Sequence, residues 1–206
     1  MREWLKKNNF LVRKIHSLLG IFPVGVFLTE HLITNSFATF GPEVYNEKIE
    51  WIQSMPYLFA LEVGFIFVPL LFHALFGFVF LWAWKDNSSR YRYARNWLYT
   101  LQRVTGIIAF VFIGYHVWEF RIETALNGKP VDFELVANEM VNIRAFLFYI
   151  VGISATVFHF TNGIWSFLVH WGITVGPKSQ RIAGYVCAGL GVALLYIGLD
   201  ALWAFR

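Results

Sequence analysis

The chain has 206 residues, of which 57% are hydrophobic, 19% aromatic and only 15% charged, and its mean hydropathy is +0.53. This composition lies outside the range of soluble globular domains and predicts an integral membrane protein. The formal net charge is +4, and the basic residues are not interleaved with aromatic ones. We therefore expect no nucleic-acid partner.

Five apolar stretches follow one another along the chain, at residues 15–36, 57–84, 96–118, 145–169 and 182–205. Each has the length that a helix needs to cross roughly 30 Å of hydrocarbon, which is about 20 residues at 1.5 Å per residue. Barrel strands would instead show about 10 residues of alternating polarity. The sequence therefore predicts an all-α integral membrane bundle of five transmembrane helices, in which residues 1–206 form a single domain.

The first stretch follows several basic residues, as a secretory signal peptide does. However, it contains Pro23, Glu30 and His31, and no small-residue cleavage site follows promptly. We therefore expect it to remain in the protein as the first span.

Lysine and arginine gather on one side of the predicted bundle. That side carries Arg2, Lys6, Lys7, Arg13 and Lys14 before the first span, Lys85, Arg90, Arg92 and Arg95 after the second, and Lys178 and Arg181 after the fourth. The loops on the other side are richer in acidic residues. Because basic loops stay inside, we expect a cytoplasmic N-terminus and, after five crossings, a C-terminus outside.

Four histidines fall one in each of the first four spans. They are His31, His73, His116 and His159, spaced 42 or 43 residues apart, and none lies in the fifth span. One buried histidine is often a packing detail. Four at this regular spacing indicate ligands that converge on a shared interior.

Depth decides which of these histidines meet. His31 and His116 come late in spans that run outward, so they lie in the outer half of the membrane. His73 and His159 come late in spans that run inward, roughly 17 Å from the inner boundary at 1.5 Å per residue. In an up-down bundle, spans 1 and 3 face each other across the axis, as do spans 2 and 4. The sequence thus predicts two bis-histidine sites stacked along the membrane normal.

Two imidazoles suit a haem better than a bare metal ion. Zinc and copper usually take three or four protein ligands, whereas haem supplies four nitrogens and needs only two axial ligands. Cys187 is the only cysteine, which excludes covalent C-x-x-C-H attachment and predicts b-type haem. With both axial positions filled, electron transfer is favoured over oxygen binding.

Gly77 and Gly163 each lie four residues after His73 and His159, on the same helical face. Two interpretations remain open at this point. The missing side chains either admit a flat ring or serve ordinary close packing of membrane helices.

Five segments give the chain a specific resemblance: RKIHSLLGIFPVG, LQRVTGI, YHVWE, FHFTNGIWSF and WGITVGPKSQR. Together they resemble the dihaem cytochrome b membrane anchor of succinate dehydrogenase, in the single-subunit, five-helix form of Gram-positive bacteria. The similarity covers nearly the whole chain, including all four spaced histidines.

The resemblance implies a function that composition and spacing do not give. His73 and His159 would hold the inner of two haem b groups, and His31 and His116 the outer. A flavoprotein subunit with FAD and an iron–sulfur subunit would dock on the cytoplasmic face of the bacterial cell membrane. Electrons from succinate would pass through both haems to menaquinone.

Other polar residues carry weaker signals. Near the inner boundary we expect contacts with the inner haem's propionates, or simple anchoring of helices at the headgroups, from Arg13, His16, Ser17 and Arg103. Near the outer haem we expect quinone neighbours at Glu62, Trp118 and Glu119. Asp200 and His170 have no assigned role.

Two alternatives stay open. A quinol:fumarate reductase anchor would have the same architecture and run the reaction in reverse, which sequence alone does not separate. A histidine-lined proton or metal transporter would use the imidazoles as a relay and would be colourless. The transporter gives no reason for the pairing of histidines by depth.

Overall fold

The structure is a computed structural model that describes residues 2–82, 88 and 90–206, and the side chains from Asn9 onward within that part. Every regular element in the described part is helical. Five segments are long and apolar enough to span a membrane: Asn9–Phe40, Leu58–Trp82, Ala94–Asn127, Ile143–His170 and Pro177–Ala204. The prediction of an all-α bundle with five spans is confirmed.

The first three spans are each built from several helical pieces. The first contains α1 (Arg2–Ile21), α2 (Val24–Ser36) and the 3₁₀ turn η1 (Phe37–Phe40). The second contains α4 (Leu58–Leu61), the π-helical segment η2 (Glu62–Phe67) and α5 (Val68–Trp82). The third contains α6 (Ala94–Val117), the π-helical segment η3 (Trp118–Glu123) and α7 (Thr124–Asn127). Pro23 separates α1 from α2, because its ring and missing N–H disfavour a continuous helix.

The last two spans are single helices, α9 (Ile143–His170) and α10 (Pro177–Ala204). Two shorter helices, α3 (Pro42–Gln53) and α8 (Phe133–Val141), lie in the loops after the first and third spans. Local chemistry fixes several ends: Asp132 and Asn142 accept backbone N–H bonds at the starts of α8 and α9, and Pro177 stands in the first turn of α10.

The predicted bounds of three spans need correction. The first runs from Asn9 to Phe40 and not from 15 to 36, because the helix begins in the polar residues before the apolar stretch. The third span runs on past residue 118 to Asn127, where Gly128 at φ 64° ends the helix. The fifth begins at Pro177 and not at 182, because its charged first turn is already helical. Hydropathy alone misses such polar helix ends. The end of the second span at 83–84 and Lys85 lie outside the described residues.

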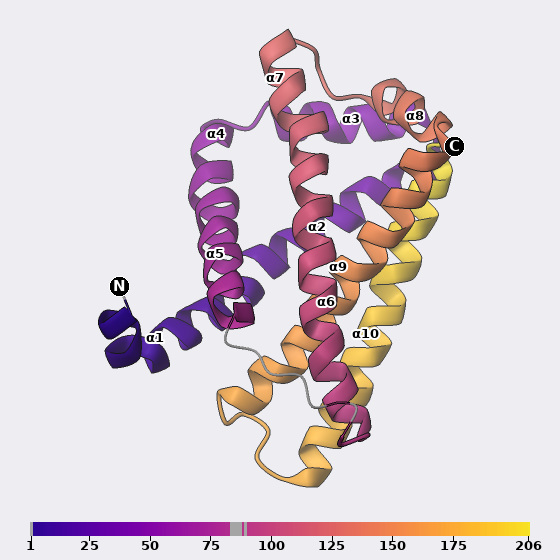
Figure 1. The fold of residues 1–206 in the computed structure, drawn as a ribbon. Helices are drawn as coiled ribbons and strands as arrows, with labels where there is room; N and C mark the ends of the chain where they lie inside the picture. Colours follow the sequence, from indigo (N-terminus) through magenta and orange to yellow (C-terminus); the bar gives the residue numbers. More distant parts are fainter. Residues whose placement is uncertain (1, 83–87, 89) are drawn as a thin grey trace.

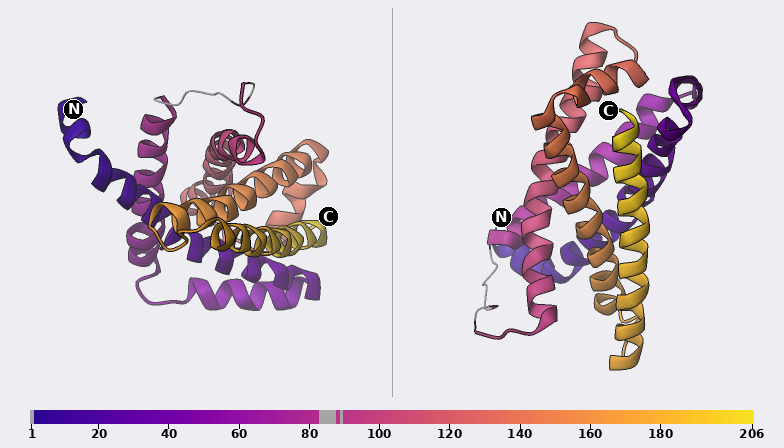
Figure 2. Two further views of the ribbon diagram at one scale, coloured as in Figure 1. Left: turned by 90° about the horizontal axis from the view of Figure 1, so that it is seen from below. Right: turned by 90° about the vertical axis from the view of Figure 1, so that its right-hand side faces the viewer.

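The spans do not pack uniformly. In Figures 1 and 2, α9 and α10 run side by side along their length, and α6 lies along the other flank of α9. Figure 1 shows α1 and α2 crossing the bundle obliquely, with α5 standing toward the N-terminal side. The helices α3 and α8 lie across one end of the bundle, near the C-terminus.

The best-packed part of the core lies at the end covered by α3 and α8. Its buried cluster is Ala38, Tyr45, Phe112, Met140, Phe146, Tyr149, Leu202 and Phe205. Gly152 lets Phe112 press against α9, because a Cβ there would overlap the phenyl ring. Asn46 ties the two covering helices together by accepting a bond from the Phe133 backbone N–H at 2.8 Å. Burial also raises the pKa of Tyr45 well above its usual range.

Candidate functional site

The four spaced histidines form two pairs across the bundle. His31 on α2 lies beside His116 near the end of α6, with ring centroids 5.5 Å apart. His73 on α5 lies beside His159 on α9, with ring centroids 6.1 Å apart. In both pairs the rings meet nearly edge to face, at interplanar angles of 79° and 84°. The structure thus brings together the same pairs that helix depth predicts, spans 1 with 3 and 2 with 4.

Backbone carbonyls hold His73 and His159, the pair that the distribution of basic residues predicts to lie toward the cytoplasm and that is called the inner pair below. Nδ1 of His73 lies 2.9 Å from the carbonyl oxygen of His16, and Nδ1 of His159 lies 2.9 Å from that of Gln102. An N–H at Nδ1 that donates to a carbonyl leaves Nε2 with its lone pair free. This is the usual arrangement of a metal-binding imidazole, in which the outer contact fixes tautomer and ring orientation.

The backbones of two glycines lie directly against the rings of His73 and His159. A Cβ at Gly106 would lie 2.8 Å from Cε1 of His159, and a Cβ at Gly20 would overlap the His73 ring. Each glycine follows the carbonyl residue by one helical turn, so the carbonyl and the bare backbone face the same imidazole. Any side chain at these positions would have to move the ring.

The inner site is duplicated along the chain. His16 and Gln102, Gly20 and Gly106, His73 and His159, and Gly77 and Gly163 are four pairs, each separated by 86 residues. Spans 1 and 2 therefore repeat the ligand-holding pattern of spans 3 and 4. This offset is visible in the sequence, and it is the signal that would have singled out Gln102, Gly20 and Gly106.

Gly77 and Gly163 face the neighbouring span and not a ligand ring. A Cβ at Gly77 would lie 3.5 Å from Nε2 of His16, and a Cβ at Gly163 would lie 3.4 Å from Nε2 of Gln102. Gln102 also joins a polar network, since its amide donates to the His159 carbonyl at 2.9 Å and accepts from Asn162 at 2.6 Å. In spans 1 and 2, the His16 ring takes the place that the Gln102 side-chain amide has in spans 3 and 4.

The His16 ring stacks on His73, with centroids 4.1 Å apart and an interplanar angle of 12°. Its Nε2 is buried and has no hydrogen-bond partner among the described residues. Arg13 lies one turn away, with its guanidinium 4.2 Å from the centre of the Phe80 ring. A buried polar nitrogen without a partner calls for an acceptor or a charged group beside it.

The remaining residues predicted near the inner boundary have partners within the chain. Ser17 accepts a bond from Trp171 Nε1 at 3.0 Å, which ties α1 to the end of α9. Lys14 donates to the His170 carbonyl at 2.7 Å. Arg103 donates to the Tyr99 carbonyl at 2.7 Å and stacks on the Tyr99 ring.

Side chains surround the outer pair, His31 and His116. Asn35 lies 3.4 Å from Nε2 of His31, and Tyr45 donates to Asn35 at 3.5 Å. The Tyr149 hydroxyl lies 3.3 Å from Nδ1 of His116, while Phe112 stacks on the His116 ring with centroids 5.8 Å apart. Asn35 follows His31 by one helical turn, so its place on the same face is visible in the sequence. Nothing in the sequence position of Tyr149 marks it as a neighbour of His116.

The predicted acidic neighbours of the outer pair are arranged in different ways. Glu62 forms a bidentate ion pair with Arg121, which joins η2 to η3. Glu119 is partly buried within η3, and the adjacent Trp118 is 54% exposed. Asp200 is exposed on α10.

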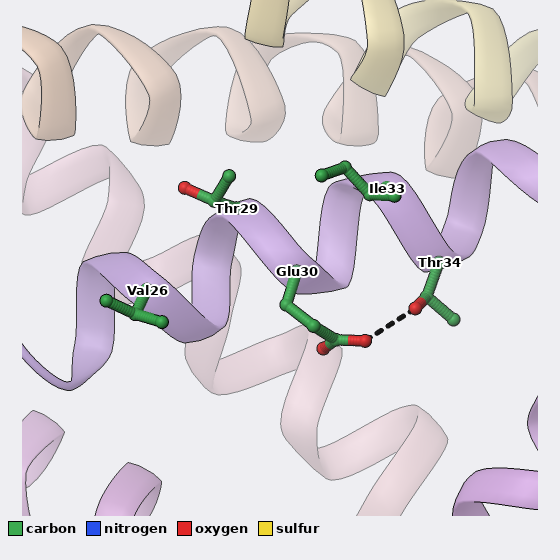
Figure 3. A pocket seen from close by; sticks show the side chains of 5 residues that line it. All are labelled: Val26, Thr29, Glu30, Ile33 and Thr34. Atoms are coloured by element: carbon green, nitrogen blue, oxygen red, sulfur yellow. Dashed lines mark hydrogen bonds between the residues drawn. The ribbon is translucent and has the colours of Figure 1, made fainter.

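Glu30 lies in an open groove of about 410 Å³ on α2, lined also by Val26, Thr29, Ile33 and Thr34. Figure 3 shows its carboxylate accepting a bond from the Thr34 hydroxyl, at 2.5 Å. Both side chains point away from the helix on this face. The groove is mostly apolar, so it is compatible with lipid chains.

The ligand chemistry fits haem better than a bare ion. In the described part of the chain, no group of three or more His, Cys, Asp or Glu side chains is arranged to hold a metal ion. Each pair offers two imidazoles, and two metal–nitrogen bonds of about 2 Å plus the two ring radii place the centroids roughly 6 Å apart. The observed separations of 5.5 and 6.1 Å agree with one iron between each pair.

Comparison with known proteins gives two matches. The family model described as succinate dehydrogenase/fumarate reductase transmembrane subunit matches residues 83–198. A succinate dehydrogenase cytochrome b558 subunit from Bacillus subtilis (strain 168) is 49% identical over 198 residues, covering 96% of this chain and 98% of that protein.

Proposed function

Because the chain belongs to the succinate dehydrogenase/fumarate reductase transmembrane subunit family, we propose that it carries electrons from an iron–sulfur subunit through two b haems to menaquinone. The observation that carries this proposal is the presence of two cross-bundle histidine pairs at different depths. One pair would serve an electron carrier at a single depth. Two stacked pairs suit a path across the membrane.

His73 and His159 are the proposed ligands of the inner haem, and His31 and His116 those of the outer. A haem held in this way is a low-spin, six-coordinate one-electron carrier with no open position for oxygen. The protein's part is to orient the imidazoles. At the inner pair the carbonyls of His16 and Gln102 do this through Nδ1. At the outer pair the Tyr149 hydroxyl lies in the corresponding place beside Nδ1 of His116, whereas Asn35 lies beside Nε2 of His31.

We assign the inner haem's propionates to the cationic end of spans 1 and 3. Nε2 of His16, which has no hydrogen-bond partner among the described residues, and the nearby guanidinium of Arg13 support this assignment. Ser17 and Arg103 lie at the same boundary and belong to the same proposed environment, although both also bond within the chain.

We place menaquinone near the outer haem, with Glu62, Trp118 and Glu119 as its neighbours. A quinone beside the iron–sulfur subunit would lie close to the electron donor and would need neither haem. Moving an electron from the negative inside to the positive outside gains about 2.3 kcal/mol per 100 mV for a full crossing. The membrane potential would thus help electrons reach a weakly oxidising quinone.

The soluble partners in this proposal are an FAD-containing flavoprotein subunit and an iron–sulfur subunit on the cytoplasmic face. This requires the N-terminus and the segment at 85–95 to face the cytoplasm and the C-terminus to face outside. Reporter fusions that found the 85–95 segment outside would invert the positions of both haems.

The reverse reaction, quinol:fumarate reduction, remains the second candidate, because the matched family includes both kinds of subunit. Its direction depends on the potentials of the soluble partners. A histidine-lined transporter is the more distant alternative.

One spectroscopic experiment tests the proposal. The purified complex should contain two haem b per chain and show two low-spin components, which become reduced at different potentials in a redox titration. A colourless protein would favour the transporter, and a single component would refute the two-haem path.

A further inference from the structure

The ion pair between Glu62 and Arg121 links the second and third spans at the end where the outer histidines lie. Arg121 Nε lies 3.0 and 3.1 Å from the two carboxylate oxygens, and Nη2 lies 2.5 Å from one of them. The side chains are 18% exposed for Glu62 and 40% for Arg121. Both charges are therefore partly withdrawn from solvent and balance each other.

Each partner lies in a π-helical segment, Glu62 in η2 and Arg121 in η3. Such segments are rare and are frequently found at functional sites. An i→i+5 bond pattern turns residues five apart toward a common face, whereas an α-helix turns them well apart. Because η3 begins at Trp118, part of the stretch from His116 to Arg121 has this wider turn. Arg121 therefore lies nearer to the helix face that carries His116 than it would in an α-helix.

The pair is closer to the outer histidines than to the inner ones. Arg121 follows His116 by five residues, about 7 Å along the helix axis, while Glu62 precedes His73 by eleven, about 16 Å. A charge in a partly buried position acts on its neighbours roughly in inverse proportion to distance. A change at this pair should therefore affect the outer site more strongly than the inner site.

We propose that Glu62 and Arg121 are positioning residues that set the reduction potential of the outer haem through their balanced charges. This inference rests on the proposed function, because it requires a haem between His31 and His116. Neither residue ligates iron or exchanges an electron in this role.

The sign of each effect follows from charge alone. Reduction adds one electron to the haem, so a nearby positive charge favours the reduced form and a negative charge favours the oxidised form. Replacing Arg121 with glutamine leaves Glu62 unbalanced and should lower the outer potential. Replacing Glu62 with glutamine leaves Arg121 unbalanced and should raise it.

A purely structural tie between η2 and η3 predicts something different. Either single change would then disturb the same contact, so both would move the outer potential in the same direction or leave it unchanged. The opposite signs expected for the two substitutions therefore separate an electrostatic role from a structural one.

The experiment is a redox titration of the intact purified complex carrying Glu62→Gln, Arg121→Gln, both changes together, or Arg121→Lys. The outer component is identified as the one that disappears in His31→Ala. We expect opposite shifts for the two single variants and near-wild-type potentials for the double variant and Arg121→Lys, which keep the charge balance. The inner component should move less than the outer one.

Two controls complete the design. Glu47→Gln breaks the exposed ion pair with Lys48, whose atoms lie 3.8 Å apart on α3, and should shift neither haem. The haem-to-protein ratio reports assembly, since an unpaired, partly buried charge destabilises a fold. If one single variant fails to assemble, the other still tests the sign: Glu62→Gln must raise the outer potential, or Arg121→Gln must lower it, and any other result overturns the inference.

Shifts of the same sign or no shift in the two single variants would overturn the inference while leaving the two-haem proposal intact, as would an Arg121→Lys variant that behaves like Arg121→Gln. A titration of the unsubstituted complex with one component only would instead refute the proposed function. The two failures are therefore distinguishable.

Discussion

The inner and outer histidine pairs are held by different means. At the inner pair, backbone carbonyls bond both Nδ1 atoms and glycine backbones press on both rings. At the outer pair, side chains are the neighbours instead: the Tyr149 hydroxyl lies beside Nδ1 of His116 and Asn35 beside Nε2 of His31, and Arg121 of the charged pair follows His116 by five residues. A contact made by a backbone carbonyl persists when its residue is substituted. A contact made by a side chain is lost or altered by a single substitution.

This difference suggests a division of roles. The inner pair repeats the same carbonyl and glycine device on two pairs of spans, so its geometry is fixed by helix packing. The outer pair has neighbours whose polarity and charge are independent of the helix backbone. The potential of the outer site is therefore the more easily adjusted, which suits the haem that is proposed to meet a substrate.

The largest effect that separates the two pairs should come from the proposed ligands themselves. His31→Ala or His116→Ala should remove mainly the outer spectral component, and His73→Ala or His159→Ala mainly the inner one, because each iron would lose an axial bond. Difference spectra of the isolated variants measure this. If His31→Ala and His73→Ala removed the same component, the pairing by depth would be wrong.

The second-largest difference between the two pairs should come from a glycine substitution beside the inner pair. Gly106→Ala places a Cβ 2.8 Å from the His159 ring, and such overpacking costs about 1–3 kcal/mol. We expect an altered electron paramagnetic resonance signal and lower occupancy of the inner haem only.

Gly114→Ala is the matched control for this change. It lies on the same span, two residues before His116, and a Cβ there meets nothing within 4 Å. Because alanine favours a helix over glycine by about 1 kcal/mol, this variant should assemble at least as well as the parent. Equal damage from both variants would show that the helix, and not the ring contact, is at fault.

An intermediate effect should come from the membrane potential. If electrons enter at the inner pair and leave at the outer, collapse of the potential should slow succinate oxidation by menaquinone several-fold, since the crossing is worth about 2.3 kcal/mol per 100 mV at most. Reduction of a soluble dye by the catalytic subunits should be unaffected. Sealed vesicles of native orientation in which an uncoupler leaves the quinone-linked rate unchanged would place the quinone elsewhere.

The smallest effect should come from Tyr149→Phe. The change removes a hydroxyl 3.3 Å from Nδ1 of His116 and keeps the buried ring, so it should cost about 1 kcal/mol of stability. The outer component should shift slightly in wavelength and potential, and the inner one should not. A larger change at the inner haem would contradict the assignment of Tyr149 to the outer pair.

Much of this protein follows from its sequence because the bilayer limits the choices. Backbone groups in hydrocarbon must bond internally, so five long apolar stretches can only be five helices. An up-down bundle then fixes which spans lie opposite each other, and residue position along a span gives depth. For this reason hydropathy and spacing are enough to pair His31 with His116 and His73 with His159, although their binding of haem remains a prediction.

The tertiary structure decided which atoms hold these histidines, although the 86-residue offset in the sequence points to some of the residues that supply them. Which carbonyl reaches Nδ1, which glycine meets a ring and which arginine finds Glu62 depend on the rotation of each helix about its axis. Helix rotation depends on the summed packing of all neighbours, such as Phe112 against Gly152, and on the two π-helical segments. Hydropathy is nearly blind to rotation, because lipid and protein neighbours are both apolar.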